Sequence, residues 1–77
     1  MSYYEGEWEH GTKSGKGRQI DEYGVLYEGY WVKGIKQGEG FLQLPCGDTY
    51  EGSFENGLKN GWGREKFKNG DSYEGLY

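Results

Sequence analysis

The sequence predicts an all-β protein in which consecutive β-hairpins form one single-layer antiparallel meander of about seven short strands. Three observations support this prediction. Tyr-Glu-Gly recurs with a strict spacing of 23 residues, at Tyr4, Tyr27, Tyr50 and Tyr73. Aromatic and acidic residues alternate after the first of these tyrosines, and glycines recur in turn-forming dipeptides throughout the chain.

The repeat divides the chain into three full units and a partial one, namely residues 4–26, 27–49, 50–72 and 73–77. We expect the whole chain, residues 1–77, to form a single domain. Its 16 glycines fall in shared columns of the aligned units, so they are positional and not those of a flexible linker. Because 18% of the residues are aromatic and only 32% are hydrophobic, aromatic rings must provide most of the buried surface.

The first strand of each unit is expected to start at its tyrosine. In residues 4–9, Tyr4, Gly6 and Trp8 alternate with glutamates, which places the aromatic side chains on one face of a strand and the carboxylates on the other. A helix is a poor alternative, because each glycine costs about 1 kcal/mol in a helix and the glycines leave no window long enough to nucleate one.

Two X-Gly dipeptides are expected to reverse the chain in each unit, since glycine accepts positive φ. The dipeptides within units are His10-Gly11, Lys33-Gly34 and Asn56-Gly57, and those between units are Tyr23-Gly24, Cys46-Gly47 and Asn69-Gly70. The return strand of the first unit should run from about Gly15 to about Asp21. Strands this short, joined by tight turns, pair with their sequence neighbours.

A register follows if large rings lie over strand glycines. The expected partners are Trp31 with Gly38, Gly29 with Gly40, Tyr27 with Leu42, and Gly17 with Trp31. Each large ring would then cover two glycines, which explains why these otherwise unfavourable strand residues are present.

The same register places Leu42, Leu44 and Phe67 on the face of the rings. The first unit departs from this pattern, because Gln19 occupies the position of Leu42. We therefore expect its return strand to bulge or shift so that Ile20 becomes buried.

The spaced frame Tyr-Glu-Gly-x-Trp/Phe-x-x-Gly-x-Lys-x-Gly-x-Gly, closing at Gly24, Gly47 or Gly70, resembles the MORN repeat (membrane occupation and recognition nexus) over residues 4–77. The resemblance implies an elongated, groove-bearing β-sheet that acts as a scaffold and has no catalytic residue in the repeat. It also implies that partner segments bind across the aromatic groove. By position, the partner-binding residues would be Tyr27, Trp31, Leu42, Leu44, Tyr50 and Phe54.

Neither catalysis nor metal binding is expected, and no cofactor is implied. His10 and Cys46 fall in turns on opposite edges of the predicted ribbon, about 15–20 Å apart, whereas a nucleophile and its base need about 3 Å. One cysteine and one histidine cannot form a structural zinc site. The repeated glutamates are interpreted as a solvated polar face: Glu5, Glu28, Glu51 and Glu74.

Charge bears on the choice of partner. A net charge of -4 disfavours nucleic acid. The repeated lysines are predicted to line one edge of the ribbon: Lys13, Lys36 and Lys59. Each lysine near an anionic membrane contributes about 1 kcal/mol, so a peripheral module that binds anionic phospholipid through this edge is the alternative function.

The main functional prediction is a non-enzymatic protein-interaction scaffold that binds a partner helix or an extended peptide along the aromatic groove. The last unit stops after one strand and leaves an open edge, so we expect either that the chain is a piece of a longer array or that this C-terminal edge strand has a partner, such as a second copy of the chain. No apolar run is long enough to span a membrane, and we expect a cytoplasmic location, with cytoskeletal or membrane association as further possibilities.

Overall fold

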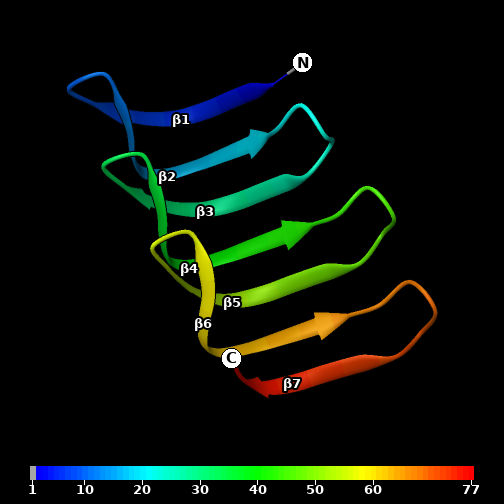
Figure 1. Ribbon diagram of the computed structural model, residues 1–77. Helices are drawn as coiled ribbons and strands as arrows, with labels where there is room; N and C mark the ends of the chain where they lie inside the picture. Colours follow the sequence, from blue (N-terminus) through cyan, green and yellow to red (C-terminus); the bar gives the residue numbers. More distant parts are fainter. Residues whose placement is uncertain (1) are drawn as a thin grey trace.

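The computed structural model describes residues 2–77, and this part of the chain contains seven β-strands and no helix. The strands are β1 (Tyr3–Glu9), β2 (Thr12–Ile20), β3 (Leu26–Val32), β4 (Ile35–Gln43), β5 (Thr49–Glu55), β6 (Leu58–Lys66) and β7 (Ser72–Leu76). They form one sheet in sequence order, with every neighbouring pair antiparallel (Figure 1). The predicted all-β meander of hairpins is therefore confirmed.

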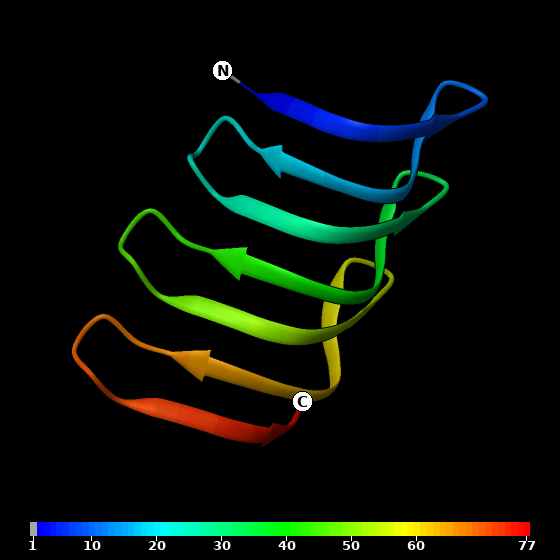
Figure 2. The same ribbon diagram turned by 180° about the vertical axis from the view of Figure 1, so that it is seen from behind.

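The sheet is a single layer that is bent along its length. Its principal extents are 41 × 27 × 14 Å, and the smallest of these leaves room for one sheet with its side chains. Each even-numbered strand changes direction sharply soon after the turn that precedes it (Figures 1 and 2). We call the side that carries the repeated tyrosine side chains the ring face, and the opposite side the outer face.

The turns within units have the geometry that their sequences predict. Each links two strands through two residues, and both residues have positive φ, as a type I′ turn requires. The φ values are 51° and 79° for His10-Gly11, 50° and 80° for Lys33-Gly34, and 53° and 82° for Asn56-Gly57. The twist of this turn type matches that of the flanking strands, so each dipeptide closes a hairpin.

The turns between units are longer and also contain a glycine with positive φ. In the first of them, the Gly24 N–H donates to the Asp21 carbonyl over 3.0 Å, and the Asp21 N–H donates to the Val25 carbonyl over 3.0 Å. The Asp21 carboxylate also accepts the backbone N–H groups of Tyr23 and Val25. Asp21 therefore closes this loop and does not continue the strand.

The register of the middle hairpin confirms two of the predicted pairs. Gly29 lies opposite Gly40, and Tyr27 lies opposite Leu42. The two predicted partners of Trp31 were wrong, because the register shifts between Gly29 and Trp31.

Trp31 pairs with Lys36 on β4 and with Gly15 on β2, and not with Gly38 or Gly17. The cause is a β-bulge in each even-numbered strand, where three residues lie opposite one. The central residue of each bulge is a glycine with positive φ, namely Gly15 (72°), Gly38 (87°) or Gly61 (74°). These glycines allow the strand to bend, and the indole ring of Trp31 is not packed over them as the predicted register required.

The ring that covers the paired glycines is the tyrosine. A Cβ atom built on Gly40 would lie 2.6 Å from Cε1 of Tyr27, and one built on Gly29 would lie 2.7 Å from the Tyr27 hydroxyl. That hydroxyl donates to the Tyr30 carbonyl over 3.0 Å. Tyr-Glu-Gly therefore recurs because the tyrosine folds back over the glycine that follows it, and no side chain fits beneath the ring.

The aromatic rings form one continuous row of edge-to-face contacts across the ring face. Centroid distances run from 4.7 to 5.4 Å in the order Trp8, Tyr4, Trp31, Tyr27, Phe54, Tyr50, Tyr77 and Tyr73. The four most central rings are the buried core of the protein: Tyr27, Trp31, Tyr50 and Phe54. Each such contact adds about 0.5–1.5 kcal/mol beyond the buried area, so the row connects consecutive units energetically.

The return strand of the first unit does not shift to bury Ile20, and that prediction was wrong. Ile20 is 37% exposed and pairs with Tyr3 and Leu26 in the regular register. Gln19 stays on the ring face, where its Oε1 accepts a hydrogen bond from Nζ of Lys13 over 3.2 Å. This hydrogen bond makes a polar residue acceptable in the position that Leu42 occupies in the next unit.

Candidate interaction surface on the ring face

The side chains of the repeated lysines extend over the ring face. Each lysine comes two residues after the turn glycine of its unit and directly precedes the bulge of an even-numbered strand. The distances from Nζ to the ring centroid are 5.4 Å for Lys13 over Tyr4, 5.3 Å for Lys36 over Tyr27, and 5.2 Å for Lys59 over Tyr50. These are cation–π contacts, so the repeated lysines form a row that covers the tyrosine rings of their units.

Two of these lysines have a polar partner, and the middle one does not. Lys13 donates to Gln19, and Nζ of Lys59 lies 3.4 Å from Oε1 of Glu65. The equivalent residue beside Lys36 is Leu42, which has no acceptor. Among residues 2–77, no side-chain oxygen makes a hydrogen bond or an ion pair with Lys36, so its ammonium group is open to an acceptor from outside the chain.

A small hollow of about 40 Å³ lies beside this lysine row. Its apolar lining is provided by Leu42, Leu44 and Tyr50, and charged groups such as Lys59 and Glu65 stand around it. The structure therefore brings together three of the six residues predicted to bind a partner. Leu42 is half-buried against the core, while Leu44 is 36% exposed at the start of a turn.

The remaining predicted partner-binding residues support this surface from below. Tyr27, Trp31 and Phe54 are only 1%, 2% and 4% exposed, so their rings are core residues of the free chain. The Tyr27 and Tyr50 hydroxyls are also engaged within the chain, because they donate to backbone carbonyls in their own strands. A partner on the ring face would therefore contact mainly the lysine row and the leucines.

Burial of the tyrosines gives the fold a pH dependence. Burial raises the pKa of Tyr27 from its ordinary value of 10.0 to about 12, and burial also raises the pKa of Tyr4 and of Tyr50. Between these pH values the unfolded chain releases protons that the folded chain keeps. The contribution of the buried tyrosines to the free energy of unfolding should therefore be complete below about pH 10 and should decrease as the pH rises toward about 12.

Urea unfolding measured from about pH 9 to about pH 11.5 tests this expectation. Tyr27→Phe is the matched control, because it keeps the ring and removes the ionisable group. The variant loses the hydrogen bond to the Tyr30 carbonyl and should be less stable at neutral pH, but its stability should fall less steeply with pH. An unchanged slope would show that Tyr27 does not contribute to the alkaline transition.

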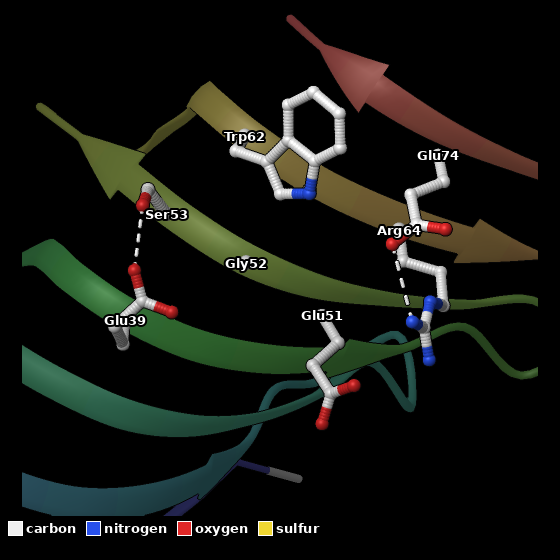
Figure 3. A pocket seen from close by; sticks show the side chains of 8 residues that line it. Glu39, Glu51, Gly52, Ser53, Trp62, Arg64 and Glu74 are labelled. Carbon is white, nitrogen blue, oxygen red and sulfur yellow. Dashed lines mark hydrogen bonds and ion pairs between the residues drawn. The ribbon is translucent and has the colours of Figure 1, made fainter.

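The outer face contains features that the sequence interpretation missed. Trp62 is 59% exposed and Tyr30 is 46% exposed on this face. Trp62 lines a shallow hollow of about 390 Å³ together with Arg64, Glu39 and Glu51 (Figure 3). The sequence interpretation treated the repeated glutamates as a solvated face and did not compare the residues opposite them, although the spacing of 23 made that comparison possible.

Cys46 and the potential metal ligands do not form a site among the described residues. Cys46 is a free, exposed thiol. Residues 2–77 contain no group of three or more histidine, cysteine, aspartate or glutamate side chains arranged to bind a metal ion. Nor does this part of the chain contain a helix long and apolar enough to cross a membrane.

Comparison with known proteins agrees with the repeat seen in the sheet. A family model described as the MORN repeat matches residues 4–21, 27–49 and 50–72. The first match ends where the first turn between units begins, which is the segment closed by Asp21. No curated protein shows a significant match to the chain.

Proposed function

Because the chain belongs to the MORN repeat family, whose repeats generally mediate protein or membrane interactions, we propose that it is a non-enzymatic protein-interaction scaffold. A partner helix or extended peptide would lie on the ring face, over the middle unit. The single observation that supports this most is the ammonium group of Lys36, which lies over the Tyr27 ring and has no hydrogen-bond or ion-pair partner among residues 2–77.

The chemistry of this surface defines the partner that would suit it. Lys36 lies over a buried ring, so a carboxylate placed beside it would form a charge-assisted hydrogen bond in a partly desolvated position. Leu42 occupies the position from which Gln19 and Glu65 reach their lysines, so it offers apolar contact near that charge. Leu44 extends the apolar surface in the hollow that it lines together with Leu42. The best fit is therefore an amphipathic segment with an acidic residue next to apolar side chains.

The equivalent surfaces of the first and third units are less suited to binding a partner carboxylate. Gln19 and Glu65 satisfy their lysines within the chain, so a partner carboxylate would have to displace an existing contact there. The aromatic row holds the ring face rigid, so less conformational entropy is lost when a partner binds there. We therefore place the centre of recognition at the middle unit.

Leu42→Glu is the variant that tests this proposal. It gives Lys36 the same internal partner that Glu65 gives Lys59, so the fold should be retained while the open ammonium group disappears. Peptides selected from a random displayed library against the natural chain should be enriched in acidic and apolar residues. Their affinity for Leu42→Glu should be at least about tenfold weaker, as expected for the loss of one charge-assisted contact.

Circular dichroism and thermal unfolding check that Leu42→Glu is folded. Selected peptides that bind the variant as tightly as the natural chain would place the binding surface elsewhere. Cosedimentation with anionic phospholipid vesicles at low and at physiological salt tests the lipid alternative. Because two of the three lysines already have partners, we expect little pelleting at physiological salt, and strong pelleting there would contradict the scaffold proposal.

A further inference from the structure

One cross-strand row on the outer face alternates acidic and basic side chains across the sheet. From β1 to β7 the row consists of Glu5, Arg18, Glu28, Phe41, Glu51, Arg64 and Glu74, with each residue opposite the next. Residues directly opposite each other have Cβ atoms about 5 Å apart, so each arginine lies between two glutamates. The alternation is interrupted at Phe41, which occupies the repeat position of Arg18 and Arg64.

The glutamates on either side of Phe41 have no ion-pair partner within the described residues. Arg64 lies opposite Glu51 but is turned toward Glu74, and its Nη2 lies 3.1 Å from Oε2 of Glu74 (Figure 3). Arg18 lies opposite Glu28 without forming an ion pair with it. The middle unit therefore lacks the cation that both flanking units provide.

A third carboxylate and a hollow complete this surface. Oε2 of Glu39 accepts a hydrogen bond from Oγ of Ser53 over 2.6 Å (Figure 3). A hollow of about 240 Å³ is lined by Phe41, Glu39 and both unpaired glutamates, with Lys16 as the one cation in its lining. It adjoins the hollow beside Trp62, since Glu39 and Glu51 line both.

We propose that the hollow around Phe41 binds an arginine side chain of a basic partner segment. The guanidinium group would lie between Glu28 and Glu51, as Arg18 and Arg64 lie between glutamates in the flanking units. A guanidinium group suits this position because its planar donors match carboxylates and its face stacks on an aromatic ring. The net charge of -4 favours the approach of a basic segment.

This inference goes beyond the proposed function, because it concerns the opposite face of the sheet and a partner of opposite charge. A single layer exposes both faces, so an acidic segment on the ring face and a basic segment on the outer face would not compete for space. The middle unit would then connect two different partners.

Titration of the isotopically labelled chain with an acetylated and amidated Gly-Arg-Gly-Arg-Gly peptide, followed by NMR, tests the proposal. The amide signals of Glu28, Phe41 and Glu51 should shift. The same peptide with citrulline, the neutral isostere of arginine, should bind at least about tenfold more weakly. The arginine peptide should also bind more weakly as salt increases. Equal affinity for the arginine and citrulline peptides would overturn the proposal.

Phe41→Arg is the matched variant, because it supplies within the chain the cation that the middle unit lacks. The chain already accommodates arginine at both equivalent positions, Arg18 and Arg64, so the spectrum of a folded protein should be retained. Its affinity for the arginine peptide should fall at least about tenfold. Glu51→Gln is a second variant, which removes one of the two carboxylates and should also weaken binding. Undiminished binding to the folded variants would refute the arginine site.

The two faces can be tested independently. Leu42→Glu should leave binding of the arginine peptide unchanged, since Leu42 lies on the ring face. Phe41→Arg should likewise leave binding of peptides selected for the ring face unchanged. Failure of one proposal is therefore distinguishable from failure of the other, and loss of arginine-peptide binding in Leu42→Glu would place that site on the wrong face.

Discussion

Trp31→Ala is expected to remove a large fraction of the free energy of unfolding of the chain. Trp31 is 2% exposed, and its ring lies 5.1 Å from that of Tyr4 and 4.7 Å from that of Tyr27. It therefore joins the first unit to the second. Truncating a buried tryptophan to alanine costs about 3–5 kcal/mol, while a chain of this length has a total stability of roughly 4–12 kcal/mol. Far-UV circular dichroism and urea unfolding measure the loss.

Trp62→Ala is the matched control for this prediction. The residue type and the substitution are the same, but Trp62 is 59% exposed on the outer face and lies outside the aromatic row. Its removal should change the free energy of unfolding by no more than about 0.5–1 kcal/mol. If Trp31→Ala and Trp62→Ala are equally stable, contact between rings of consecutive units is not what stabilises the sheet.

The architecture was predictable because its signals are local and repeated. A dipeptide such as Asn56-Gly57 specifies a type I′ turn by itself, and the alternation after Tyr4 specifies a strand. With the spacing of 23, three copies of both signals leave one arrangement of hairpins. No long-range information was needed, since each strand pairs only with the strands next to it in sequence.

The register around Trp31 could not be predicted, because the bulges look like regular strand in the sequence. Gly38 and Gly40 are two positions apart in the sequence, which is the spacing of one face of a strand. Only Gly40, however, pairs with a residue of β3, namely Gly29. Gly38 instead has a positive φ of 87° and bends the strand. That bend places Lys36 opposite Trp31 and its side chain over the ring of Tyr27, a contact that the sequence interpretation did not include.

The prediction of the binding site was limited for the same reason, because the sequence does not show how the strands pair and how the rings pack. A recurring tyrosine indicates an exposed aromatic groove as readily as a closed core, because the sequence does not show that Tyr27 folds over Gly40 and donates to the Tyr30 carbonyl. On the outer face the difference between Phe41 and its equivalents was visible at the repeat spacing. Its meaning depends on the register, which places Phe41 between Glu28 and Glu51.

Gly40→Ala is the second substitution with a large expected effect. The added methyl group would lie 2.6 Å from Cε1 of Tyr27, well inside the contact distance of two carbon atoms. The tyrosine ring cannot move aside easily, because it lies 4.7 Å from the ring of Trp31 and 5.1 Å from that of Phe54. Overpacking of this kind costs about 1–3 kcal/mol, and urea unfolding should show at least the upper part of this range.

The same substitution in the first unit shows whether the rigidity of the ring determines the cost. A methyl group on Gly17 would lie 2.7 Å from Cε1 of Tyr4, nearly the same clash. Tyr4, however, is only half-buried, and one of its two ring neighbours, Trp8, is 58% exposed, so its ring has more room to move than that of Tyr27. Gly17→Ala should therefore cost less than Gly40→Ala, and Gln43→Ala, on the same strand as Gly40 but exposed, should cost little. Equal losses at Gly17 and Gly40 would show that the clash alone sets the cost and that the surrounding rings do not hold Tyr27 in place.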